Sequence, residues 1–256
     1  MRATRSRFDR IAQSYESSLS PLPERYCRLI QRRFALGTDD RVVDLGCGSG
    51  LLTFPLARFS DRVEGLDISK ELIRIAKRKD TERKIKWIVA PVEKFNFGHD
   101  RYKLIIAYES FHLFPNIDRL IRRFERGLLV GGYLCIGSCY YSWEEQLEDV
   151  FIDTFQRFGV DWGEPKYQTC PWFPDILRQN SKHLSPAMEE VIQVPARRHI
   201  RSIAACLSSI DKAASLTGCA RHDLINELTA RFRVRLSSDW TEGLSSYFIH
   251  YTKRLA

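Results

Sequence analysis

The chain has 256 residues, of which 44% are hydrophobic, and its 40 Lys and Arg against 32 Asp and Glu give a formal charge of +8. This length fits one core with an insertion or a small appended lobe, and no apolar run approaches the ~20 residues that cross a bilayer. The basic N-terminus leads into no apolar segment, so we expect neither a secretory signal nor membrane insertion, and a cytoplasmic protein.

The seven cysteines contain no CxxC pair. Their odd number and their position inside apolar stretches predict reduced, mostly buried thiols. A zinc site needs paired Cys or His ligands at close spacing. The sequence offers none, and we expect no metal.

The first half of the chain predicts two helices and then an alternation of strands and helices. Apolar residues recur at helical spacing in 8–19 and 23–36, which we expect to pack over one end of a sheet. Ser69 is the expected cap of a later helix. The predicted strands are 41–45, 62–67, 86–90, 103–108 and 133–138, and the helices between them are 51–59, 69–79 and 118–129. This alternation indicates an α/β fold with helices on both faces of a mostly parallel sheet.

The second half predicts mainly helices, at 144–158, 196–216 and 221–232, before a final strand at 245–254. One more strand must pair with the last, and either 188–194 (MEEVIQV) or 232–237 (FRVRLS) fits. That strand would complete a seven-stranded sheet. We therefore expect three parts: N-terminal helices and core in 1–139, a mainly helical cap in 140–230, and final strands in 231–256.

The glycine-rich stretch VVDLGCGSG, residues 42–50, follows the first predicted strand. A phosphate-binding P-loop needs Lys and Ser or Thr after the last glycine, where this chain has Leu51 and Leu52. A dinucleotide fingerprint needs a third spaced glycine, where Leu51 stands. The remaining pattern suits a ligand with a carboxylate facing backbone N–H groups and an ammonium near an acid. Asp67 ends the next strand, where a carboxylate can accept both hydroxyls of a ribose.

In this order the motifs of residues 8–138 resemble those of the class I S-adenosylmethionine-dependent methyltransferases, most closely the small-molecule branch around trans-aconitate methyltransferase. VVDLGCGSG, VEGLDIS, IVAPVEKFNF, YKLIIAYESFHLF and LLVGGYLCIGS resemble the successive family motifs, and FDRIAQSYE resembles an N-terminal motif of that branch. Pro91 and Lys103 replace aspartates that are usual in the family. The resemblance implies a Rossmann-like sheet with a helical cap and S-adenosylmethionine as cofactor.

The resemblance also implies cofactor roles for individual residues. It places Asp44 near the ammonium, Asp67 on the ribose and Ile68 beside the adenine. Because Pro91 lacks a carboxylate, Val92 N–H and Glu93 are the alternatives for the adenine amino group. The residues expected around the methionyl part are Gly46, Cys47, Gly48, Gly50 and Tyr108, with Tyr15 closing over the cofactor.

Two titratable residues follow the fourth predicted strand, at the sheet edge where substrate should lie. His112 is the stronger candidate for a general base because its ordinary pKa is near neutral. Its apolar neighbours fit a packed lid on the cofactor equally well. Glu109 is the second candidate, with binding of the cofactor or of a backbone N–H as the alternative.

The cap offers candidate substrate residues. Aromatic residues suit an apolar or flat acceptor, with core packing as the alternative; they are Tyr140, Tyr141, Trp143, Trp162, Trp172 and Phe173. Arg197 and Arg198 would form a fork for a carboxylate if the acceptor is anionic, with a solvated surface as the alternative.

We therefore expect an enzyme that methylates O, N or C of a small molecule, such as a carboxylate or a metabolic intermediate. An RNA-directed methyltransferase is the first alternative, suggested by the charge, but YESF after strand four lacks the motif of enzymes that flip bases. We accordingly expect no nucleic-acid partner. A cofactor-binding protein without transfer activity is the second alternative. The choice between a monomer and a homodimer stays open.

Overall fold

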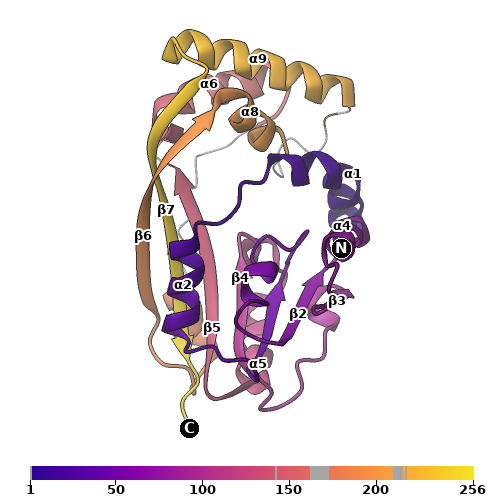
Figure 1. The fold of residues 1–256 in the computed structure, drawn as a ribbon, viewed down its shortest axis with the longest axis vertical. Helices are drawn as coiled ribbons and strands as arrows, with labels where there is room; N and C mark the ends of the chain where they lie inside the picture. Colours follow the sequence, from indigo (N-terminus) through magenta and orange to yellow (C-terminus); the bar gives the residue numbers. More distant parts are fainter. Residues whose placement is uncertain (1, 142, 162–172, 210–215, 217) are drawn as a thin grey trace.

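A seven-stranded sheet forms the centre of the described chain (Figure 1). The structure is a computed structural model that describes residues 2–141, 143–161, 173–209, 216 and 218–256. The strand order is β3-β2-β1-β4-β5-β7-β6, and only β7 runs antiparallel to its neighbours. The bounds are β1 Arg41–Leu45, β2 Arg62–Asp67, β3 Lys86–Val89, β4 Tyr102–Tyr108, β5 Leu128–Tyr141, β6 Met188–His199 and β7 Trp240–Lys253. The predicted α/β fold with a seven-stranded, mostly parallel sheet is confirmed.

Helices cover both faces of the sheet because its central strands are buried on both sides. Neighbouring residues of β4 alternate between two apolar clusters: Ile105 packs in the cluster that includes α5 and α7, and Ile106 in the one that includes α2 and α3. The N–H of Leu72 donates to Ser69 Oγ at 3.2 Å, which confirms the predicted cap of α4. The bounds of the helices around the core are α1 Arg2–Ser18, α2 Glu24–Arg33, α3 Thr53–Leu56, α4 Lys70–Lys79, α5 Ile117–Gly127 and α7 Phe173–Asn180, with short 3-10 helices at η1 Val92–Lys94 and η2 Phe111–Leu113.

Three helices form a cap at one end of the long strands β5, β6 and β7 (Figure 1). They are α6 Trp143–Arg157, α8 Ile200–Ser209 and α9 Gly218–Leu236. The cap has its own apolar cluster, in which Phe155, Ile203 and Phe232 are at most 1% exposed. Helix α1 contacts both α8 of the cap and α4 of the core, so the N-terminal helix bridges the two.

The structure decides which segment pairs with the last strand, and it corrects two boundaries. Residues 188–194 lie in β6, whereas 232–236 form the end of α9, where Phe232 continues the helical spacing of Leu224 and Leu228. The predicted start of a helix at 196 is wrong, because residues 196–199 pair with β7. The range 140–230 therefore contains a strand of the sheet, and only one of the final strands lies in 231–256. The division into three parts otherwise stays a prediction.

Three expectations from the composition concern membrane-spanning helices, cysteines and metal sites. No helix among the described residues is long and apolar enough to span a membrane. The described cysteines are free thiols, at positions 27, 47, 135, 139, 206 and 219, and Cys170 lies outside the described residues. The described residues contain no cluster of three or more His, Cys, Asp and Glu side chains that could hold a metal ion.

A buried carboxylate ties together the strand starts at the edge of the sheet opposite the glycine loop. Glu64 on β2 is 4% exposed and accepts hydrogen bonds from Tyr102 Oη, from Lys86 Nζ at 2.9 Å and from Arg101 Nη2 at 2.9 Å. Burial alone would raise the pKa of Glu64, but these donors together hold it below its usual range. The donors come from β3 and from the start of β4, so one side chain fixes three neighbouring segments.

We expect Glu64→Gln to lower the free energy of unfolding at pH 7 by about 2 kcal/mol, because it removes the charge that faces three cations, Arg41, Lys86 and Arg101. A lowered pKa in the folded state stabilises above the unfolded pKa of about 4.3, and this contribution is lost as the pH falls. The difference from wild type should therefore shrink below pH 4 in urea unfolding curves. Glu71→Gln, which removes an exposed ion pair with Arg74, is the control and should cost at most about 0.5 kcal/mol. A constant difference from pH 7 to pH 3 would contradict the ionic role.

Candidate functional site

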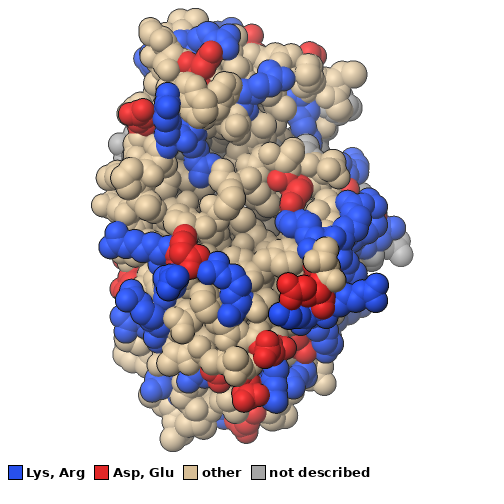
Figure 2. Space-filling model, viewed as in Figure 1, with Lys and Arg blue, Asp and Glu red and all other residues tan. Residues whose placement is uncertain are grey.

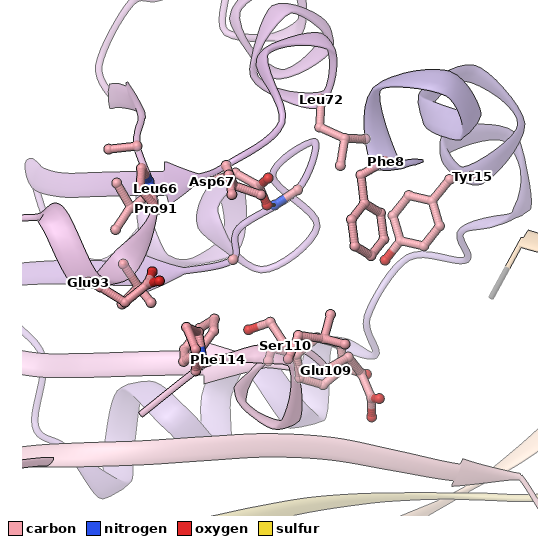
Figure 3. Close-up of a pocket in the computed structure, with 18 residues that line it drawn as sticks. Phe8, Tyr15, Leu66, Asp67, Leu72, Pro91, Glu93, Glu109, Ser110 and Phe114 are labelled. Atoms are coloured by element: carbon pink, nitrogen blue, oxygen red, sulfur yellow. Dashed lines mark hydrogen bonds between the residues drawn. The ribbon is translucent and has the colours of Figure 1, made fainter. Parts of the chain in front are cut away.

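A cavity of about 210 Å³ lies at the ends of β1, β2 and β4, under helix α1. Loops from these strands and two aromatic side chains of α1 form its wall (Figure 3). Eight of the predicted cofactor residues line it: Tyr15, Gly46, Gly48, Asp67, Ile68, Val92, Glu93 and Tyr108. Asp44, Cys47 and Gly50 do not belong to its lining.

The glycine loop approaches the loop after β4 too closely for a side chain. Gly46 has φ +65°, and a Cβ added there would lie 2.5 Å from Cβ of Ser110. Ser110 Oγ donates to the carbonyl of Leu45 at 2.6 Å, which locks the two loops together. Glycine at position 46 is therefore required both by backbone conformation and by space. Ser110 lines the cavity as well, and sequence reasoning missed it.

Three backbone N–H groups of the glycine loop are hydrogen-bonded to acceptors within the chain. Cys47 N–H donates to the Leu66 carbonyl at 3.0 Å, and Gly50 N–H donates to the Cys47 carbonyl at 3.0 Å. Gly48 N–H donates to Asp67 Oδ2 at 2.9 Å. These three N–H groups are therefore already paired within the chain, and the expectation that backbone N–H groups of this turn meet a ligand carboxylate stays a prediction for the others. Buried backbone donors must be paired, and the sequence does not show which partner each finds.

Asp67 is held rigidly at the cavity wall. Its Oδ2 accepts the N–H of Gly48, its Oδ1 accepts the N–H of Ser69 at 2.7 Å, and the residue is 8% exposed. Burial raises the pKa of Asp67, while the two backbone donors act in the opposite direction. Each carboxylate oxygen has a second acceptor site. The orientation therefore leaves two acceptor sites for two vicinal hydroxyls.

Helix α1 covers the cavity. The rings of Phe8 and Tyr15 lie next to each other and face inward (Figure 3). Asp9 holds this helix in place, since its Oδ1 accepts Ser69 Oγ at 2.7 Å and Glu71 N–H at 3.2 Å at the start of α4. Burial, with Cys206, Glu109 and Asp67 nearby, raises the pKa of Tyr15 well above its usual value, so its hydroxyl stays protonated. Asp9 was missed as a positioning residue, although it stands in the FDRIAQSYE motif.

Asp44 lies beneath the glycine loop. It is 1% exposed and accepts the hydroxyl proton of Thr53 at 2.7 Å. Burial raises its pKa to about 7. Gly50 packs against Phe54 and Trp87, on the side away from the cavity lining. The cofactor roles of Asp44, Cys47 and Gly50 stay predictions.

Glu109, and not His112, brings a titratable group to the cavity. Glu109 lies in the left-handed region with φ +52°, and its Oε1 accepts Cys139 N–H at 2.6 Å. Burial raises the pKa of Glu109 to about 7. In Figure 3 its carboxylate points away from Asp67 and Glu93. His112, on the 3-10 helix η2, is exposed and outside the cavity lining, and partial desolvation lowers its pKa.

The two predicted arginines of the cap do not form one fork. Successive residues of a strand face opposite sides, and Arg197 and Arg198 lie side by side in β6. Arg197 Nε pairs with Glu242 at 3.5 Å. The guanidinium of Arg198 instead lies 4.2 Å from the ring centre of Tyr141, on the other face. The prediction of a shared carboxylate fork is wrong for this reason.

The predicted aromatic residues of the cap divide into three groups. Tyr140 and Tyr141 end β5 and are half-buried. Phe173 is 0% exposed and packs edge-on against Phe111, which is the core packing weighed as the alternative. Three others cannot be placed: Trp162 and Trp172 lie outside the described residues, as does the side chain of Trp143.

The comparisons with known proteins agree with this geometry. Residues 43–136 match the family model described as "Methyltransferase domain". A Saccharomyces cerevisiae protein named "Probable S-adenosylmethionine-dependent methyltransferase CRG1" is 32% identical over 67% of this chain and 55% of its own length. Residues 43–136 are therefore a methyltransferase domain, and the chain resembles the class I S-adenosylmethionine-dependent methyltransferases.

Two solved structures are similar to this chain in fold. A phosphoethanolamine N-methyltransferase 2 from Haemonchus contortus, in complex with S-adenosyl-L-methionine, has a TM-score of 0.59 at 17% identity, over 98% of this chain and 60% of that one. The [4+2]-cyclase SpnF has a TM-score of 0.60 at 15% identity, over 99% and 95%. At these identities the likeness shows the fold alone. The chain spans about half of the first curated relatives it matches, 55% and 44% of their lengths.

The cavity fits the family's cofactor. Asp67 presents two oriented acceptor sites for a ribose, and the close approach of Gly46 to Ser110 fixes the adjoining wall. Tyr15 and Phe8 supply an apolar cover. These residues would hold the nucleoside and part of the methionyl chain of S-adenosylmethionine.

We expect Asp67→Ala to weaken binding of S-adenosylhomocysteine at least tenfold, a loss of ~1.4 kcal/mol, because a charged hydrogen-bond acceptor is removed. Isothermal calorimetry measures the dissociation constant. The matched control is Asp61→Ala, which removes an exposed aspartate outside the cavity and should leave the affinity unchanged. An affinity of Asp67→Ala within twofold of wild type would remove the ribose role.

Proposed function

We propose that this chain transfers a methyl group from S-adenosylmethionine to O, N or C of a small-molecule acceptor. The observation that carries the proposal is the placement of Asp67 and Glu109, two of the three carboxyl groups that line the cavity among the described residues; the third is Glu93. Asp67 is fixed by two backbone donors on one wall, and Glu109 faces away from it on another, toward the side where α1 meets the cap. One carboxylate suits the nucleoside and leaves the other for the acceptor.

The work of the protein is mainly positioning. S-adenosylmethionine, when bound, supplies a methyl group already activated by the positive charge on sulfur. Holding the acceptor in line with that methyl can contribute on the order of 7–11 kcal/mol. Tyr15 and Phe8 cover the cavity and keep water from it, and Asp9 holds their helix against α4.

Glu109 can act as a general base for an acceptor that must lose a proton. With a pKa of about 7, it is ionised in roughly half of the molecules at neutral pH and takes up protons readily. The N–H of Cys139 fixes Oε1, which leaves Oε2 to receive the proton. An acceptor hydroxyl or carbon acid needs such a base, whereas a carboxylate or free amine does not.

One observation supports the alternative that the chain binds the cofactor without transferring a methyl group. The fold alone does not require methyl transfer, because the cyclase SpnF shares it. Transfer of labelled methyl groups from S-adenosylmethionine decides between the two. Label in a small-molecule extract supports the proposal, label only in tRNA or rRNA would support the RNA-directed alternative, and binding without label in either supports the cofactor-binding protein.

For a hydroxyl or carbon-acid acceptor, we expect Glu109→Gln to lower kcat by about 10²- to 10⁴-fold, because the base is lost. The wild-type rate should rise with pH through about 7, where Glu109 loses its proton, and the variant should lack this rise. His112→Ala is the control and should keep kcat within about threefold. Equal losses in the two variants, or an unchanged pH profile in Glu109→Gln, would exclude Glu109 as the base.

A further inference from the structure

We propose that Arg198 binds an anionic group, a carboxylate or a phosphate, on the acceptor. This inference rests on the proposed function and adds a chemical class to the small molecule. It assigns one end of the acceptor to Arg198 and the reacting end to the cavity beside Glu109. The observations that carry it are the absence of an acidic partner for Arg198 among the described residues, the orientation of its guanidinium and its contact with Tyr141, near Cys139 and Glu109.

Arg198 has no acidic partner in the described part of the chain. Its neighbour Arg197 pairs with Glu242, whereas no carboxylate oxygen of a described residue lies within 4.0 Å of the Arg198 nitrogens. Its Nη1 donates to Ser20 Oγ at 2.8 Å, and its Nε is buried and makes no hydrogen bond in the same part of the chain. A half-buried guanidinium stays charged. No described carboxylate pairs with this side chain, so an anion bound at Nη2 would supply its counter-ion.

The guanidinium is oriented before any ligand arrives. It lies 4.2 Å from the ring centre of Tyr141, within the distance of a cation–π contact. The hydrogen bond to Ser20 holds Nη1, a second point of the guanidinium plane. A planar cation fixed at two points loses little freedom on binding, and arginine matches carboxylate and phosphate through paired hydrogen bonds.

A series of contacts along β5 links Arg198 to Glu109. The backbone N–H of Cys139 donates to Glu109, and Tyr141 lies two residues further along the strand, about 7 Å away by strand geometry. Arg198 contacts the ring of that tyrosine. Cys206 of α8 is close enough to Tyr15 to act on its pKa, so the cap closes over the same side. In Figure 2, Lys and Arg side chains gather beside the upper part of β6.

A purely structural role makes a different prediction. Arg198 joins β6 to the segment between α1 and α2 through Ser20. If that link were its whole purpose, removing the Ser20 hydroxyl would have the same effect as removing the guanidinium. If Arg198 binds an anion, Ser20→Ala keeps the binding group and Arg198→Met does not.

The test uses the whole chain saturated with S-adenosylhomocysteine and titrated in a calorimeter with malonate, inorganic phosphate and the neutral malonamide. We expect wild type to bind at least one of the two anions and not malonamide. Arg198→Met should weaken that binding about tenfold or more. Arg198→Lys, which keeps the charge but loses the planar fork, should fall between. Arg197→Met should stay within about twofold of wild type, and Ser20→Ala, which removes one of the two contacts that orient the guanidinium, should lose clearly less affinity than Arg198→Met.

The outcomes separate this inference from the proposed function. Failure to bind S-adenosylhomocysteine contradicts the proposed function. Normal binding of S-adenosylhomocysteine with no binding of either anion contradicts only the role of Arg198, as do equal losses in Arg198→Met and Ser20→Ala, or equal affinity for malonate and malonamide. Preference for malonate assigns a carboxylate acceptor, and preference for phosphate assigns a phosphorylated one.

Discussion

The two hydrogen bonds that Asp67 accepts from Gly48 and Ser69 organise the whole site. They join the loop after β1 to the end of β2 and to the start of α4. The same start of α4 receives Asp9, so α1 is placed over the cavity through the same junction. This short series of polar contacts therefore sets the relative positions of the glycine loop, of Asp67 at the end of β2 and of helix α1 over the cavity. The apolar clusters on the two faces of the sheet supply the stability that keeps these contacts in register.

The core could be predicted from sequence because its signals are local. Short apolar runs, helical spacing and the cap at Ser69 each depend on neighbouring residues, and glycine at 46 is demanded by one backbone angle and one close approach. The partners of the loop's N–H groups could not be predicted, because Leu66 and Asp67 reach them from another strand. The preference for His112 over Glu109 also rested on local information. Ordinary pKa values favoured histidine as the base. In the structure, burial raises the pKa of Glu109 to about 7, and His112 is exposed.

The cap was harder to predict because its strand and helices have less distinct patterns. The residues of β6 alternate between exposed and half-buried positions and include two glutamates and two arginines, so the segment lacks the apolar run of a central strand. FRVRLS has β-rich residues but follows Leu224 and Leu228 at helical spacing, and tertiary packing of Phe232 keeps it helical. The two arginines looked equivalent in sequence. Strand alternation places Arg197 beside Glu242 and Trp240 on one face and Arg198 beside Tyr141 on the other.

The continuity of β5, β6 and β7 from core to cap has a mechanical consequence. Three hydrogen-bonded strands run through both parts, so the cap has no flexible joint about which it could swing as a separate body (Figure 1). Helix α1 is attached differently, through side chains such as Asp9 and through packing on α4 and α8. Entry and exit of ligands would therefore cost least through displacement of the N-terminal helix. Helix α1, Arg2–Ser18, would then be the movable cover of the site, and the cap would stay in place.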